Sequence, residues 1–67
     1  IMTYNMQYHA IDGSDGGTTA SGFSTIDEAR IWAAANINMD EFTANDDIVQ
    51  IHEGNTDTLG EAVEDLN

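Results

Sequence analysis

Two stretches rich in aspartate and asparagine could bind a calcium ion, because carboxylate and amide oxygens are the ligands that calcium prefers. The stretch 12–17 has Ser14 and Gly16 where a calcium loop places its second and third ligands, and no glutamate stands at the twelfth position. The stretch 36–47 has suitable residues at positions 1, 3, 5 and 12, but Glu41 stands where a glycine is required. Neither stretch predicts a dedicated calcium site, so we expect a hairpin turn and a solvated loop.

The two histidines, His9 and His52, could bind zinc only if two or three further ligands converged on them. The chain has no cysteine, so carboxylates would have to supply those ligands. Both histidines fall on predicted strands with their side chains on outward faces. We therefore expect two surface histidines, with no metal and no cofactor.

Four pairs of adjacent carboxylates could divide the roles of a general acid and a general base if a pocket shifted their pKa values apart. They fall in predicted helix ends, loops and solvated faces, at 27–28, 40–41, 46–47 and 64–65. A 67-residue domain has little room for a pocket of about 300 Å³ or more. Because the chain also lacks a Ser-His-Asp order, a glycine-rich phosphate loop and a thiol, we expect no enzymatic activity.

The net charge is the most unusual feature of the chain. Thirteen Asp and Glu residues face one arginine, Arg30, and no lysine, which gives a formal net charge of −12. Such a charge opposes compaction through self-repulsion, and a basic partner, a high-salt solvent or disorder would account for it. Disorder is the weakest account, because 40% of the residues are hydrophobic. The sign of the charge argues against direct binding of nucleic acid, and no apolar run approaches the ~20 residues of a membrane span.

The segment 25–37 is predicted to form the longest helix. Thr25 and Glu28 have the spacing of a capping box, which satisfies the free backbone N–H groups of a first helical turn. Apolar residues recur at helical spacing from Ile26 to Ile37, and three consecutive alanines favour the helix. Within this helix, we expect Arg30 to pair with Asp27, one turn earlier.

The segments on both sides of this helix predict strands and a second helix. Residues 3–11 alternate between apolar and polar, which indicates a half-buried strand, and the weaker strand 18–23 completes a hairpin. Residues 38–47 read as a polar loop anchored inward by Phe42, followed by a third strand over 48–53. Thr58 and Glu61 form a second capping box, and the apolar residues from Leu59 to Leu66 have helical spacing.

These elements predict an α+β fold in a single acidic domain, residues 1–67. We expect a two-layer ββαβα arrangement with a three-stranded antiparallel sheet, one long helix and a short C-terminal helix. A right-handed crossover would place the third strand beside the first, giving the strand order 2-1-3. A monomer is favoured, although the edge strand 18–23 could support a dimer.

The acidic surface itself is the best candidate for a binding site. A domain of this length has a radius of gyration of about 11 Å, and a duplex as long as its diameter carries roughly 16 phosphates. On the predicted C-terminal helix, Glu61, Glu64 and Asp65 would share one face. The expected partner-binding residues are Asp40, Glu41, Asp46, Asp47, Glu53, Asp57, Glu61, Glu64 and Asp65.

In its size, its lack of cysteine, its element order and its acidic excess after residue 39, the chain resembles the small phage anti-CRISPR proteins that act as DNA mimics. The resemblance covers the whole chain but concerns only these general features. Because no shared sequence motif supports it, it assigns no functional role to any individual residue. It implies a non-catalytic inhibitor that occupies the basic DNA-binding surface of a CRISPR-Cas surveillance complex. The partner would be a Cas subunit, in the cytoplasm of the bacterial host.

Two other interpretations of the charge stay open. A halophilic organism would use the same acidic coat as a solvation device, and the absence of lysine suits that interpretation. An acidic adaptor or antitoxin-like protein would instead bind some other basic protein.

Overall fold

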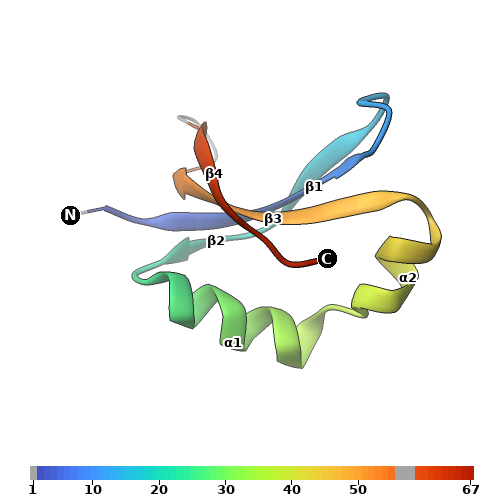
Figure 1. Cartoon of the computed structure of the whole chain (residues 1–67). Helices are drawn as coiled ribbons and strands as arrows, with labels where there is room; N and C mark the ends of the chain where they lie inside the picture. The colour runs from blue at the N-terminus through green and yellow to red at the C-terminus, as the bar shows by residue number, and fades with distance from the viewer. Residues whose placement is uncertain (1, 56–58) are drawn as a thin grey trace.

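The computed structural model describes residues 2–55 and 59–67 as one four-stranded antiparallel sheet with two helices (Figure 1). The strand order is β2-β1-β3-β4, and every neighbouring pair is antiparallel. In chain order the elements are β1 (Tyr4–Ala10), β2 (Gly16–Phe23), α1 (Ile26–Asn36), α2 (Met39–Ala44), β3 (Asp47–Gly54) and β4 (Leu59–Asp65).

The predicted ββαβα fold with a three-stranded sheet is therefore wrong, and the element order is ββααββ. The order of the first three strands agrees with the expected 2-1-3. The errors lie in two segments of the second half of the chain. The predicted polar loop contains α2, and the predicted C-terminal helix is the strand β4.

The capping box at the start of α1 is confirmed. The Thr25 hydroxyl accepts a hydrogen bond from the Glu28 backbone N–H at 3.0 Å. The Glu28 carboxylate accepts one from the Ser24 backbone N–H at 3.3 Å, one residue before the cap. The first contact satisfies a donor that the first helical turn leaves free, the second ties the residue before the cap to that turn, and α1 begins where the sequence predicts.

The second helix begins with a cap that the sequence also carries. Asn38 precedes α2, and its side-chain oxygen accepts a hydrogen bond from the Glu41 backbone N–H at 3.4 Å. Asn-Met-Asp-Glu thus has the spacing of a capping motif, which the loop prediction overlooked. The helix ends at Ala44, Asn45 is its C-cap, and Asp46 follows in the left-handed region with φ 58°. A residue in that conformation commonly terminates a helix.

The strand β4 forms because a longer strand is available to pair with it. The predicted helix would have been about two turns long, and a helix that short is marginal in water. Pairing with β3 supplies hydrogen bonds along most of the segment, with Ile51 opposite Glu64 and Gly54 opposite Leu59. Gly60 permits a close approach, since a Cβ there would lie 2.8 Å from the backbone oxygen of Glu53. Thr58, the proposed cap of the predicted helix, lies outside the described residues.

The hydrophobic core lies between the sheet and the helices, which cover the same face of the sheet (Figure 1). Met6, Val49 and Ile51 are fully buried on that face of β1 and β3. Ala29 and Ala33 face them from α1, and their small side chains allow the helix to pack close to the sheet. The radius of gyration of 11.1 Å agrees with the size expected for this length.

The opposite face of the sheet carries polar side chains that hydrogen-bond to one another. The Gln7 amide donates to the Asn5 side-chain oxygen and to the Thr18 hydroxyl, both at 2.7 Å. On β3, the His52 ring nitrogen Nε2 lies 3.0 Å from the side-chain oxygen of Gln50, two residues earlier on the same strand. The Asn5 side chain is fully buried although it lies on this face. Its amide nitrogen donates to the Gly54 backbone oxygen at 3.0 Å and its oxygen accepts from Gln7, so the buried polar group is satisfied.

Gly60→Ala distinguishes the strand from a helix by the sign of its effect on stability. In a helix the added methyl would raise the free energy of unfolding by roughly 1 kcal/mol. In β4 the same methyl meets the Glu53 carbonyl, and we expect a loss of roughly 1–3 kcal/mol, as in an overpacked site. Urea unfolding measures the difference, and a more stable variant would contradict the pairing of β4 with β3.

Candidate acidic binding surface

Arg30 joins the first helix to the last strand. Its guanidinium contacts the Asp27 carboxylate at 2.5 Å, as the helical spacing predicts. It also holds both carboxylate oxygens of Glu64, one through Nε at 2.6 Å and the other through Nη2. Hydrogen bonds from Arg30 lower the pKa of Glu64, and Glu64 in turn raises the pKa of Arg30. The only Lys or Arg side chain of the protein is therefore committed to contacts within the chain.

The structure separates the predicted C-terminal row of carboxylates. On a helix Glu61, Glu64 and Asp65 would share a face, but successive residues of a strand point to opposite faces. Glu64 turns toward α1, where it meets Arg30. Asp65 lies on the other face, where it accepts a hydrogen bond from the Gln50 amide at 2.8 Å. The prediction that these three residues form one row is wrong.

The nine predicted partner-binding residues fall into three groups. Glu64 and Asp65 are engaged within the protein, and Asp57 lies outside the described residues. The other six make no side-chain hydrogen bond or ion pair to the described residues 2–55 and 59–67. They are Asp40, Glu41, Asp46, Asp47, Glu53 and Glu61.

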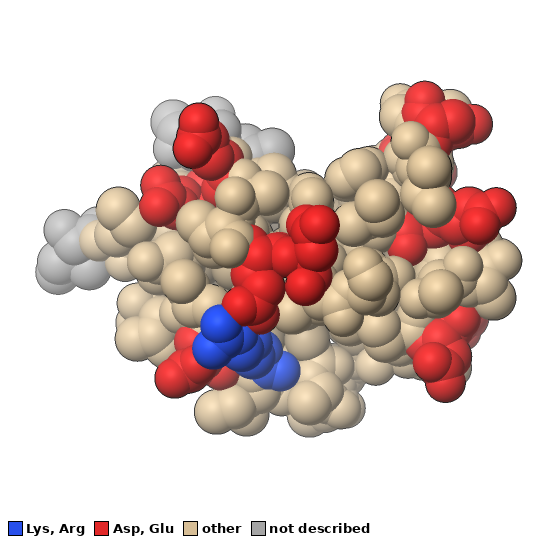
Figure 2. Space-filling model, in the orientation of Figure 1, with Lys and Arg blue, Asp and Glu red and all other residues tan. Residues whose placement is uncertain are grey.

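Four of these six gather at one end of the molecule, where α2 leads into β3. The β1–β2 turn lies beside this junction, because the Ile11 backbone N–H donates to the Asp46 backbone oxygen at 2.9 Å. Figure 2 shows the resulting acidic groups on the right, at the end of the molecule where α2 and the β1–β2 turn lie in Figure 1. We call this region the acidic end, and it comprises Asp12, Asp15, Asp40, Glu41, Asp46 and Asp47.

The two turn residues of the acidic end were not among the predicted partner-binding residues. The Asp12 carboxylate accepts hydrogen bonds from the hydroxyl and the backbone N–H of Ser14, at 2.6 and 2.9 Å. These bonds favour the ionised carboxylate and so lower the pKa of Asp12. Asp15 likewise accepts from the Gly16 backbone N–H at 2.9 Å. The turn therefore adds two charges whose place beside α2 only the fold could show.

A cleft of about 490 Å³ separates the β1–β2 turn from the α2–β3 junction. Asp12 and Asp46 both line it. Within residues 2–55 and 59–67, no group of three His, Asp or Glu side chains is placed to hold a metal ion. His9 instead contacts the Ala10 backbone oxygen at 3.0 Å. The cleft thus presents negative charge without the geometry of a metal site.

The remaining two unpartnered carboxylates lie at the opposite end. Glu53 is near the end of β3, and Glu61 is near the start of the neighbouring β4. The β3 segment from Asp47 to Glu53 extends over roughly 20 Å at the rise of an antiparallel strand. The six predicted residues without a side-chain partner in the described part of the chain therefore form two separated groups, with the Arg30 contacts in α1 and β4 between them.

Comparison of the chain with protein-family models, curated proteins and solved structures finds no match. In the part of the chain that the structure describes, neither helix has the length and apolar character needed to cross a membrane.

Glu64→Gln should destabilise the fold in a pH-dependent way. Because the pKa of Glu64 is lowered in the folded state, its ion pair stabilises the protein above the ordinary glutamate range, and this stabilisation is lost as the pH falls through the lowered pKa. We therefore expect Glu64→Gln to lower the urea midpoint at neutral pH and to match the unsubstituted protein in strong acid.

Glu61→Gln is the matched control for this measurement, because Glu61 lies on the same strand and has no described ion pair. Acidification weakens the general repulsion between carboxylates in both variants alike. This contribution to stability therefore cancels when the two variants are compared. Equal effects of the two substitutions at every pH would contradict a specific role for the Arg30–Glu64 contact.

Proposed function

We propose that this protein is a non-catalytic inhibitor that binds the basic surface of a nucleic-acid-binding protein in place of DNA. The observation that carries the proposal is the acidic end. Six carboxylates from the β1–β2 turn, α2 and the start of β3 lie together there, and the one arginine of the chain is engaged elsewhere. Such a surface attracts a basic groove over long range and repels nucleic acid.

The dimensions of the molecule support this proposal. Its longest axis is 35 Å, and a duplex of that length carries about 20 phosphates. Thirteen carboxylates on a body of this size are a comparable charge load. Association should be fast and steered by charge, and salt should weaken it steeply.

The resemblance to acidic anti-CRISPR proteins suggests the class of partner. The proposed partner is a Cas subunit of a surveillance complex, and the proposed site of action is the bacterial host cytoplasm. The proposal requires no catalytic step, no cofactor and no second copy of the chain, so the inhibitor is proposed to act as a monomer.

The combination of Asp40→Lys and Asp46→Asn tests the acidic end. Asparagine tolerates the positive φ that residue 46 adopts, so the turn should be retained. We expect the unsubstituted protein to displace a fluorescent target duplex from at least one of a panel of purified surveillance complexes. The variant should require roughly tenfold more protein or more for the same displacement, as expected for lost charge complementarity.

The control changes the net charge by the same amount at the opposite end, through Glu61→Lys and Glu53→Gln. If both double variants lose activity equally, total charge matters and the acidic end does not. If the unsubstituted protein displaces DNA from none of the complexes, a surveillance complex is not the partner.

A halophilic domain is the second candidate, and the acidic residues that lie outside the acidic end favour it. Acidic groups lie at both ends and in the middle of the face in Figure 2. A solvation coat would be dispersed in this way, whereas a single docking surface would be concentrated. This interpretation assigns no partner to the charge.

Thermal unfolding across a salt series separates the two candidates. The binding-protein proposal predicts a cooperative transition already at about 0.1 M salt, where screening extends over about 10 Å. A halophilic domain would fold only in molar salt. Circular dichroism at both conditions decides the matter, and folding that requires molar salt would remove the support for DNA mimicry.

A further inference from the structure

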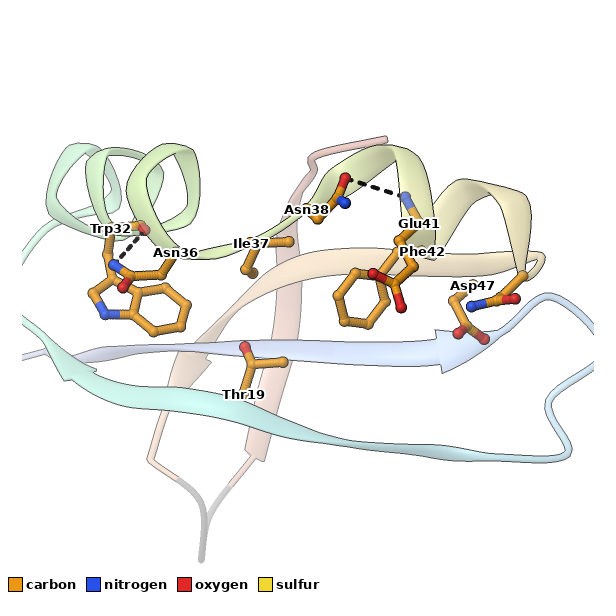
Figure 3. A pocket seen from close by; sticks show the side chains of 9 residues that line it. Thr19, Trp32, Asn36, Ile37, Asn38, Glu41, Phe42 and Asp47 are labelled. Atoms are coloured by element: carbon orange, nitrogen blue, oxygen red, sulfur yellow. Dashed lines mark hydrogen bonds between the residues drawn. The ribbon is translucent and has the colours of Figure 1, made fainter.

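A groove of about 390 Å³ lies where the chain passes from α1 to α2 above the sheet (Figure 3). Its volume is within the range of small-ligand pockets, although the length of the chain led us to expect little room for one. Side chains from both helices, from β2 and from the start of β3 line it. Unlike the acidic end as a whole, the groove has aromatic walls as well as carboxylates.

Two aromatic rings are held in place along the groove by packing from behind. The Trp32 ring lies 5.8 Å from the Phe23 ring, and the Phe42 ring lies 5.5 Å from the Tyr8 ring, measured between centroids. Trp32 and Phe42 both remain half-buried, and Ile37 lies between them in Figure 3. The groove therefore offers partly exposed ring surface whose position is fixed before any ligand binds.

Two carboxylates give the groove an uncompensated negative charge. Glu41 and Asp47 line it, and neither makes a side-chain hydrogen bond or ion pair to the described residues. Its lining contains no His, Lys or Arg. The Asn36 amide is already committed, because it donates to the Trp32 backbone oxygen at 3.0 Å. The complementary ligand is a cation with an apolar, flat body.

Arginine meets these requirements better than a metal ion or lysine does. No three metal-ligating side chains converge in the described part of the chain. A guanidinium is planar, stacks on aromatic faces and donates several hydrogen bonds to carboxylates, whereas an ammonium is compact and strongly hydrated. We propose that this groove binds an arginine side chain presented by the basic partner, an inference that rests on the proposed function and names how that partner is anchored.

The only tryptophan of the chain, Trp32, reports on this binding directly. Titration with the peptide acetyl-Gly-Arg-Gly-amide at low salt should change the Trp32 fluorescence saturably. The matching citrulline peptide has the same shape without the charge and should give no saturable change. The lysine peptide should bind roughly three times more weakly or worse, because it loses the planar contacts. Equal binding of the citrulline peptide would overturn the proposal.

The combination of Glu41→Gln and Asp47→Asn should weaken binding of the arginine peptide about tenfold, while the backbone cap at residue 41 is retained. The control, Glu53→Gln with Glu61→Gln, removes the same charge at the far end and should weaken binding less than about twofold. Circular dichroism verifies the fold of both variants. Equal losses of peptide affinity in the two variants would show that total charge alone attracts the peptide, and would overturn the proposed arginine site.

The same variants separate this inference from the proposed function, because neither Asp40 nor Asp46 lines the groove. If Asp40→Lys with Asp46→Asn abolishes DNA displacement while Glu41→Gln with Asp47→Asn retains it, the inhibitor stands and the arginine site is overturned. If the arginine peptide binds as predicted but no complex loses its DNA, the site stands and the proposed function fails.

Discussion

Arg30 is the only Lys or Arg residue of a heavily acidic chain, and its ion pairs connect the first helix to the last strand. It lies on α1 and pairs with Asp27 on the same helix and with Glu64 on the last strand. Exposed ion pairs of this kind contribute little to stability on average. Here, however, the contact joins the helix layer to an edge strand that carries several carboxylates. Because no other Lys or Arg exists, the remaining carboxylates have no Lys or Arg of the same chain to neutralise them.

The two faces of the sheet determine where those carboxylates lie. One face buries Met6, Val49 and Ile51 against the helices, so it cannot hold unpaired charge. The other face is occupied near its centre by hydrogen-bonded amides such as Gln7 and Gln50. Charge is therefore displaced to turns, helix ends and the edge strand. The acidic end follows from this exclusion, since three such segments meet there.

The candidate site was only partly predictable from sequence. The carboxylates of α2 and the α2–β3 junction were predicted individually as partner-binding, and they do lie together. Asp12 and Asp15 were assigned to a hairpin turn, and no local pattern indicates that this turn lies beside residue 46. The groove was missed altogether, because it needs Trp32 and Phe42 from different helices on either side of it. Residues that come together from two different helices leave no periodic pattern in the amino-acid sequence.

The sequence by itself determined the elements whose signals are local. The alternation in β1 and the capping box of α1 are contained within a few residues, and both predictions agree with the structure. Tertiary structure decided the last segment, from Leu59 onward, whose apolar spacing also fits a helix. There the unpaired edge of β3 offers backbone hydrogen bonds, and Gly60 permits the close approach. A two-turn helix cannot compete with such pairing, because the free-energy cost of nucleating a helix exceeds the stabilisation that its few backbone hydrogen bonds provide.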